Sequence, residues 1–110
     1  MYAYDYEGAN PNTPTWISRT GGDVQAIAAT ATEVYVGGHF RNFPEEKLAR
    51  PHLASVYVTT GLATPWSPGA NGSFGVWSIT ATADSLLIGG DFNRAGSRRQ
   101  PGFARFAGTP

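Results

Sequence analysis

The chain has 110 residues, with a charged content of 15%, and glycine (14) and proline (8) together make up one residue in five. This length allows one small domain, and so many residues that interrupt regular structure exclude a long helical bundle. Eight basic and eight acidic residues give a net charge of zero, which excludes a global field that would attract nucleic acid or an anionic membrane surface.

Hydrophobic content of 41% and aromatic content of 13% predict a globular rather than a disordered chain. Cysteine is absent, so we expect no disulfide, no thiolate nucleophile and no cysteine-ligated metal. The opening residues 1–7 lack the basic and apolar regions of a secretory signal, and no apolar run approaches the roughly 20 residues that cross a bilayer. We therefore expect no membrane span.

The chain matches itself at an offset of 52 positions. Residues Val24–Phe40 lie over Val76–Phe92, and eight of the 17 pairs are identical. After a two-residue slip, Pro51–Val56 lies over Pro101–Phe106. An internal period of about 50 residues is the sequence signature of propellers and solenoids.

A partial copy of the unit precedes the first one. Ala3–Gly8 followed by Thr13–Trp16 is similar to Ser55–Gly61 followed by Thr64–Trp66. The chain therefore divides into the tail of a preceding repeat, a complete repeat 1 and an incomplete repeat 2, at residues 1–23, 24–75 and 76–110 respectively.

In chain order, each unit is predicted to form a strand, a tight turn, a strand, a loop and a third strand. The first strands are Val24–Thr30 and Val76–Thr82, and the second strands are Glu33–Val36 and Ser85–Ile88. Each pair suggests a hairpin whose alternate apolar residues share a core face. Glycine pairs at 37–38 and 89–90 are expected to end the second strands, through a positive φ or a close backbone approach.

The loop after each glycine pair differs between the two units. Phe40 and Phe92 are expected to fold back over the hairpins. Pro44–Arg50 is predicted to form one helical turn that Pro51 stops, and the shorter Gly96–Gln100 replaces it in the second unit. A weak outer fourth strand is expected near the Pro-Trp pair at 65–66, for which repeat 2 contains no match.

Together, these motifs resemble a known repeat. The segments Val34–Phe40 and Leu86–Phe92, with Arg50–Ala54, Thr60-Gly61 and Thr64–Gly72, are similar to the delta-60-type β-propeller repeats of large secreted or surface-attached bacterial proteins, notably of actinobacteria. The resemblance covers nearly the whole chain. It implies an all-β fold, a partial β-propeller of about two small antiparallel blades over residues 1–110, and an extracellular or cell-surface location.

The resemblance supplies no catalytic or cofactor residues, and the residues themselves suggest none. His39 and His52 occupy non-equivalent positions and have no ligand partners at metal-binding spacing. Glu45-Glu46 is predicted to form a solvated ion-pair cluster with Lys47 and Arg50. We therefore expect no catalytic residue, no metal and no cofactor.

Two groups of side chains are candidates for contacts. Arg94, Arg98, Arg99 and Arg105 form a local basic cluster, which is expected to be a solvated loop, with phosphate binding as the alternative. Exposed aromatic rings stack on sugars or form protein-binding hot spots. The aromatic candidates are Trp16, Trp66 and Trp77, together with the alternating Tyr2, Tyr4 and Tyr6. Trp16 and Trp66 match in the repeat and are expected to fill junctions between blades, whereas Trp77 has Gln25 as its counterpart and is the better ligand-binding candidate.

Three functions are compatible with this pattern. The first is a non-enzymatic scaffold or interaction module within a larger secreted or cell-surface propeller. The second is a lectin-like carbohydrate-binding module whose blades assemble as a homo-oligomer, and the third is a non-catalytic part of a propeller enzyme. The expected partners are neighbouring blades of the same parent chain or identical subunits, with a glycan or a cell-surface protein as a further partner and no nucleic acid.

Overall fold

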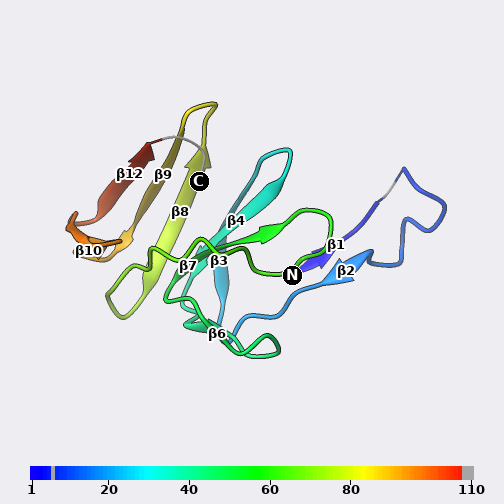
Figure 1. Cartoon of the computed structure of the whole chain (residues 1–110), viewed down its shortest axis with the longest axis horizontal. Coiled ribbons are helices and arrows are strands. Elements are labelled where there is room, and N and C mark those ends of the chain that lie inside the picture. Colours follow the sequence, from blue (N-terminus) through cyan, green and yellow to red (C-terminus); the bar gives the residue numbers. More distant parts are fainter. Residues whose placement is uncertain (6, 108–110) are drawn as a thin grey trace.

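The computed structural model describes residues 1–5 and 7–107 (Figure 1). Their regular structure consists of β-strands alone, as the sequence predicts. The strands are β1 (Tyr2–Ala3), β2 (Trp16–Ile17), β3 (Val24–Ala29), β4 (Glu33–Gly38), β5 (Asn42–Phe43), β6 (Leu48–Ala49), β7 (Leu53–Tyr57), β8 (Gly75–Ala81), β9 (Ser85–Asp91), β10 (Arg94–Ala95), β11 (Arg98–Arg99) and β12 (Phe103–Ala107).

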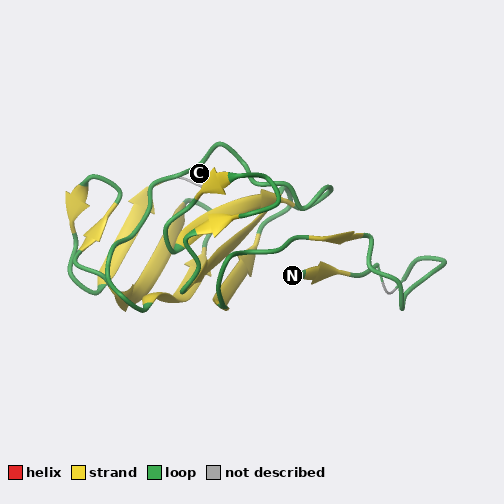
Figure 2. Cartoon of the chain, turned by 90° about the horizontal axis from the view of Figure 1, so that it is seen from below, coloured by secondary structure: helices red, strands yellow, loops and turns green. Residues whose placement is uncertain are grey.

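The strands form several small antiparallel sheets, none of which closes on itself. Strands β3, β4 and β7 form sheet 1 with β4 in the centre, and β8, β9 and β12 form sheet 2 with β9 in the centre. Three further strand pairs, β1–β2, β5–β6 and β10–β11, are two-stranded. Figures 1 and 2 show sheets 1 and 2 next to each other, with the loop between β1 and β2 projecting away from both.

Sheets 1 and 2 have corresponding registers. Ile27 pairs with Val36 in sheet 1, and Ile79 pairs with Ile88 in sheet 2. Each first strand also shifts register at the same place, between Val24 and Ala26 in β3 and between Val76 and Ser78 in β8. The predicted hairpins of the first and second strands are thus present in both halves of the chain.

Gly37-Gly38 ends β4, as the sequence predicts, whereas Gly89-Gly90 lies inside β9, one residue before its end at Asp91. Their φ angles are not positive, so the close-approach alternative applies. A Cβ on Gly37 would lie 2.5 Å from Cγ1 of Val76 in the other sheet, and a Cβ on Gly90 would collide with the carbonyl oxygen of Gly75. These glycines therefore allow close packing of a sheet against its neighbour and of a strand against a strand.

The expected helical turn at Pro44–Arg50 is wrong, because this segment belongs to a hairpin of β5 and β6. Lys47 adopts a left-handed φ of 57°, which closes a four-residue turn at 44–47 rather than continuing a helix. The corresponding hairpin of β10 and β11 turns over two residues, 96–97, with a φ of 61° at Gly96. The two-residue slip in the sequence match is the difference between these turns.

Each sheet has two distinct faces. Face A carries Val34 and Val36 in sheet 1 and Leu86 and Ile88 in sheet 2, and face B carries Tyr35 in sheet 1 and Leu87 in sheet 2. Face A of sheet 2 packs on face B of sheet 1, with β8 against β3 and β4. The buried residues of this interface are Tyr35, Leu53, Ala70, Val76, Leu86, Ile88, Phe92, Ala95 and Ala104.

A second core covers part of face A of sheet 1. Its buried residues are Val34, Val36, Phe40, Phe43, Ala54 and Val56. Met1 and Trp16, next to or within the β1–β2 pair, pack against it. Phe40 and Phe92, which the sequence predicted to fold over the hairpins, are thus buried in equivalent places of the two cores.

The expected fourth strand is reduced to a short edge segment of sheet 1. Ala63 forms an isolated antiparallel bridge with Val56, and the Thr64 amide donates to the Ser55 carbonyl at 2.9 Å. In the β1–β2 pair, the Thr15 amide donates in the same way to the carbonyl of Ala3 at 2.7 Å. Tyr6, predicted to alternate with Tyr2 and Tyr4, lies outside the described residues, and the strand itself covers only Tyr2–Ala3.

Candidate functional site

Trp66 lies between the two sheets. Its ring meets the Tyr35 ring of β4 edge-on, with centroids 5.3 Å apart, and the Phe106 ring of β12 at 5.5 Å. Tyr35 itself is buried, and its hydroxyl donates to the Glu33 carboxylate at 2.8 Å. Burial, followed by the contact with this carboxylate, raises the pKa of the Tyr35 phenol. The phenol thus stays neutral at physiological pH.

Trp16 has a corresponding position on the other side of sheet 1. Its indole N–H donates to the Val58 carbonyl at 2.9 Å, and its ring covers the Cα of Gly61, where a Cβ would overlap it. Gly61 has a φ of 74°, which glycine adopts without strain. Most of the apolar surface of Trp16 and Trp66 is therefore covered by packing within the chain.

Trp77 differs from both, because it is 54% exposed. It lies at the register shift of β8, where one extra residue on this strand leaves its side chain outside the regular ladder. Gln25 holds the equivalent place in β3. Trp77 is thus an accessible aromatic ring, and the structure does not bring it together with Trp16 or Trp66 into one cluster of interacting rings.

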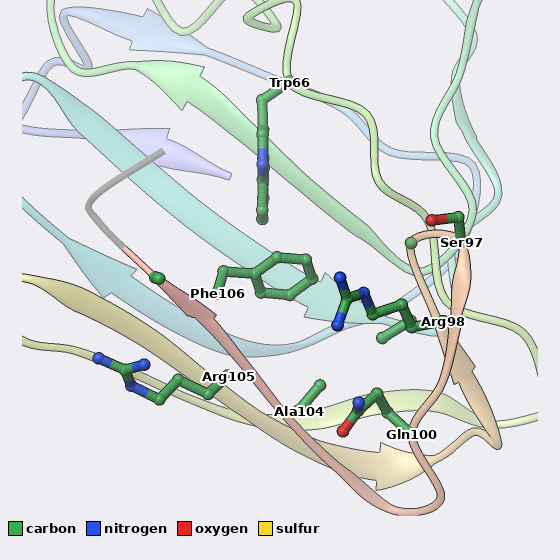
Figure 3. A pocket seen from close by; sticks show the side chains of 10 residues that line it. Trp66, Ser97, Arg98, Gln100, Ala104, Arg105 and Phe106 are labelled. Atoms are coloured by element: carbon green, nitrogen blue, oxygen red, sulfur yellow. The ribbon is translucent and has the colours of Figure 1, made fainter.

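A groove runs between the β10–β11 hairpin and β12 (Figure 3). It has a volume of about 570 Å³. Trp66, Phe106 and Ala104 supply its apolar wall, and Arg98 and Gln100 supply polar groups from the hairpin side. In Figure 3 the guanidinium of Arg98 points toward the Phe106 ring, and Arg105 extends to the opposite side of β12.

Little in the sequence indicates this groove. Phe43 is buried at the place in the first hairpin where Ala95 stands in the second, so the second hairpin leaves more space beside its sheet. The presence of Ala95 at the place of Phe43, together with the shorter turn of the second hairpin, is the sequence feature that could have indicated the groove. Of the predicted basic cluster, Arg98 and Arg105 line the groove, and neither forms an ion pair with a described residue.

The two histidine rings have different partners. The ring of His52 is buried, and its Nδ1 lies 2.8 Å from the Ala70 carbonyl oxygen. The His39 ring contacts the Phe74 ring at a tilt of 43°, with ring centroids 5.4 Å apart. Residues 1–5 and 7–107 contain no group of three or more His, Asp or Glu side chains that could hold a metal ion.

The predicted ion-pair cluster around Glu45 and Glu46 is wrong in its partners. Glu45 pairs with Arg19 at 3.3 Å, and both side chains are exposed. Glu46 instead accepts a hydrogen bond from the Ala63 amide at 3.0 Å, and Arg50 donates to the Thr64 carbonyl at 3.0 Å. Glu46 in the β5–β6 turn and Arg50 directly after β6 therefore bind the edge segment of sheet 1.

Where the chain is described, it forms no helix with the length and apolar character needed to cross a membrane. The geometry offers one groove with an aromatic wall and unpaired arginines, and one exposed tryptophan outside it. No protein-family model, no curated protein and no solved structure matches this chain.

Proposed function

We propose that the chain is a non-enzymatic scaffold module, and that sheets 1 and 2 are successive blades of a larger secreted or cell-surface β-propeller. The way in which the two sheets stack supports this proposal. Face A of sheet 2 covers face B of sheet 1, so the contact uses a different face of each sheet. Such a head-to-tail contact leaves one face of each kind free for a further unit.

The free faces carry the counterparts of buried interface residues, and this observation carries the proposal. Leu53 on face B of sheet 1 is fully buried, whereas Phe103, its counterpart on sheet 2, is 57% exposed. Ile79 on face A of sheet 2 is packed against the core, whereas Ile27 on sheet 1 is 60% exposed. Further blades would cover both side chains.

Identical copies fit this stack less well than blades of another sequence. The β1–β2 pair packs on sheet 1 in the same way that β7 and the edge segment pack on sheet 2. The matching backbone hydrogen bonds of Thr15 and Thr64 indicate this correspondence. A second copy stacked on face B of sheet 2 would bring its β1 onto β12. This overlap favours neighbouring blades of a parent chain over the homo-oligomeric alternative.

Light scattering over a range of concentrations tests the proposal. Because stacked copies overlap, we expect the chain to aggregate through its uncovered apolar side chains without a defined stoichiometry, and Phe103→Ser to weaken that aggregation. A closed oligomer of defined mass would favour the homo-oligomeric alternative. Phe74→Ser is the matched control, because Phe74 is 54% exposed but lies in the loop before β8, where its ring contacts the ring of His39. A folded monomer at every concentration, unaffected by either substitution, would contradict the proposal.

Carbohydrate binding remains a second candidate because Trp77 presents an accessible indole. Indole faces stack on the C–H faces of sugars. A glycan array with the chain and its Trp77→Ala variant tests this function. Binding that Trp77→Ala abolishes would support it, and an array without signal would contradict it. The third candidate, a non-catalytic part of a propeller enzyme, would require an activity located in other parts of a parent protein.

A further inference from the structure

A second groove lies where segments from both halves of the chain meet, and we call it the arginine groove. Arg41 comes from the segment between β4 and β5, Arg94 comes from β10, and residues 68–72 belong to the loop that leads to β8. The groove has a volume of about 430 Å³, within the range of about 300–1,000 Å³ that small-molecule sites occupy. All residues that line it lie within 41–96, so the groove is formed without any segment beyond either end of the chain.

The loop at 68–72 is bound to the segments on both sides of the groove. The Ala70 amide donates to the Pro51 carbonyl at 3.1 Å, and the Gly96 amide donates to the Gly69 carbonyl at 2.9 Å. These main-chain hydrogen bonds fix the walls of the groove before a ligand binds. A preformed site avoids the cost of ordering loops on binding.

Two exposed guanidinium groups line the arginine groove without a partner. The side chains of Arg41 and Arg94 form no ion pair with a described residue, and no acidic residue lines the groove. Their main chains, in contrast, are held in place. The Arg41 carbonyl accepts from the Arg50 amide at 2.8 Å, and the Arg94 amide donates to Oδ1 of Asn71 at 2.9 Å. The groove therefore presents two positive charges on a fixed backbone.

The repeated scaffold does not require these two charges. Arg41 has Asn93 as its counterpart in the second unit, and Arg94 has Asn42 as its counterpart in the first. In the β10–β11 hairpin Arg94 pairs directly with Arg99, whereas the corresponding pair of β5–β6 is uncharged. Like charges directly opposite each other in an antiparallel pair are destabilising. An anion bound beside Arg94 would offset this repulsion.

We propose that the arginine groove binds a doubly charged phosphate group, which a phosphate monoester or the free ion carries. At neutral pH a phosphate monoester has a charge of about −1.5 to −2, which matches two guanidinium groups. The planar fork of arginine binds phosphate oxygens in pairs, so Arg41 and Arg94 supply both charge and geometry. The amides of Gly69 and Gly72, which also line the groove, donate to no described residue and are further donors. The inference does not depend on the stacking of blades.

Titration with methyl phosphate, followed by phosphorus NMR, tests the inference. This method observes the resonance of the ligand, so association of the chain does not hide binding. We expect a dissociation constant on the order of 1 mM, as a small exposed site would give. Arg41→Gln and Arg94→Gln should each weaken binding about tenfold, because each removes charge-assisted hydrogen bonds.

Arg98→Gln is the matched control for both substitutions. Arg98 is an exposed arginine of the same hairpin as Arg94, but it lines the other groove. Its substitution changes the net charge equally and should alter the affinity by about twofold or less, since exposed charges outside the site are screened. An equal loss in all three variants would show diffuse charge attraction and would overturn the proposal. Unaltered protein that binds no methyl phosphate at about ten times the expected dissociation constant would also overturn it.

A competition experiment leaves the protein unaltered. Methyl sulfate has the shape of methyl phosphate but one negative charge, so about fivefold more of it should be needed to displace methyl phosphate, as expected for a partly exposed ion pair. In Arg41→Gln, where one guanidinium remains, this preference should shrink. Equal affinities of the two ligands for the unaltered protein would show that Arg41 and Arg94 do not act together on a doubly charged group.

Two further ligands identify the carrier of the phosphate group. Glucose 6-phosphate has a ring that can contact the side chains of Pro51 and Pro68, which line the groove. Tighter binding of glucose 6-phosphate than of inorganic phosphate would support the phosphate site and assign a sugar phosphate to it. Equal affinities that fall in Arg41→Gln and Arg94→Gln would support the site and assign the free ion. Binding of glucose itself at the same concentrations would contradict recognition of the phosphate group.

Discussion

The indole of Trp66 meets the ring of Tyr35 edge-on, at 5.3 Å and an interplanar angle of 90°. This contact joins the edge segment of sheet 1 to the central strand of the same sheet, and Phe106 extends it to sheet 2. Perpendicular aromatic pairs contribute stability beyond their buried area. The aromatic contact is therefore a structural link between both sheets.

Trp66→Ala should destabilise the chain by about 3 kcal/mol, because it removes a packed aromatic side chain and leaves a cavity between the sheets. Trp77→Ala, at a 54% exposed position, should change the free energy of unfolding by about 0.5 kcal/mol or less. Urea denaturation followed by circular dichroism compares the two variants. Equal losses would contradict the different roles assigned to these tryptophans.

Gly37→Ala should destabilise the chain by roughly 1–3 kcal/mol, because its Cβ would meet Val76 Cγ1 at 2.5 Å. The cost arises from a side chain of the neighbouring sheet, so Val76→Ala should relieve part of it. The two single variants and the double variant form a mutant cycle, in which we expect a coupling energy of about 1 kcal/mol. Simple additivity would show that Gly37 acts within its own strand.

Gly102→Ala should cost roughly 1–2 kcal/mol for a different reason, because Gly102 has a φ of 74°. The nearest neighbour of a Cβ there, the Gly90 carbonyl oxygen, is 3.9 Å away, so the strain is conformational rather than steric. D-alanine, introduced at this position by chemical ligation, favours positive φ and should keep the stability of the glycine form. A loss with D-alanine equal to that of L-alanine would disprove this explanation.

Thr64→Val should destabilise the chain by about 2 kcal/mol, because the buried Ser55 hydroxyl loses its partner and stays away from water. Ser55→Ala combined with Thr64→Val removes both hydroxyls and should cost less than the sum of the single substitutions. Thermal unfolding of the four proteins gives the comparison. A double variant as unstable as that sum would indicate that the two hydroxyls do not act as a pair.

The sequence predicted the hairpins of both sheets because β3 and β4 alternate side chains with a period of two and have the same spacing as β8 and β9. It could not predict the small hairpins, since two-residue strands are too short to show a period. The left-handed Lys47, which closes the first of these turns, has no sequence signal comparable with that of glycine.

The candidate groove was less accessible to sequence reasoning than the sheets. The basic cluster containing Arg98 and Arg105 was apparent in the sequence, but its relation to Trp66 depends on how the hairpin and β12 fold against the edge segment. Those contacts join residues about 30 to 40 positions apart, and they follow from tertiary packing rather than local pattern.

Strand β4 is flanked by β3 and β7, with a core on each of its faces. Its amides should therefore exchange with deuterated solvent only through global unfolding. Exchange from such a strand requires both the strand ladder and the stacked sheets to separate. Strands β8 and β12 each have one unpaired edge, so their amides should exchange earlier through partial fraying. The sequence in which the strands take up deuterium would thus show how far each sheet stabilises the other.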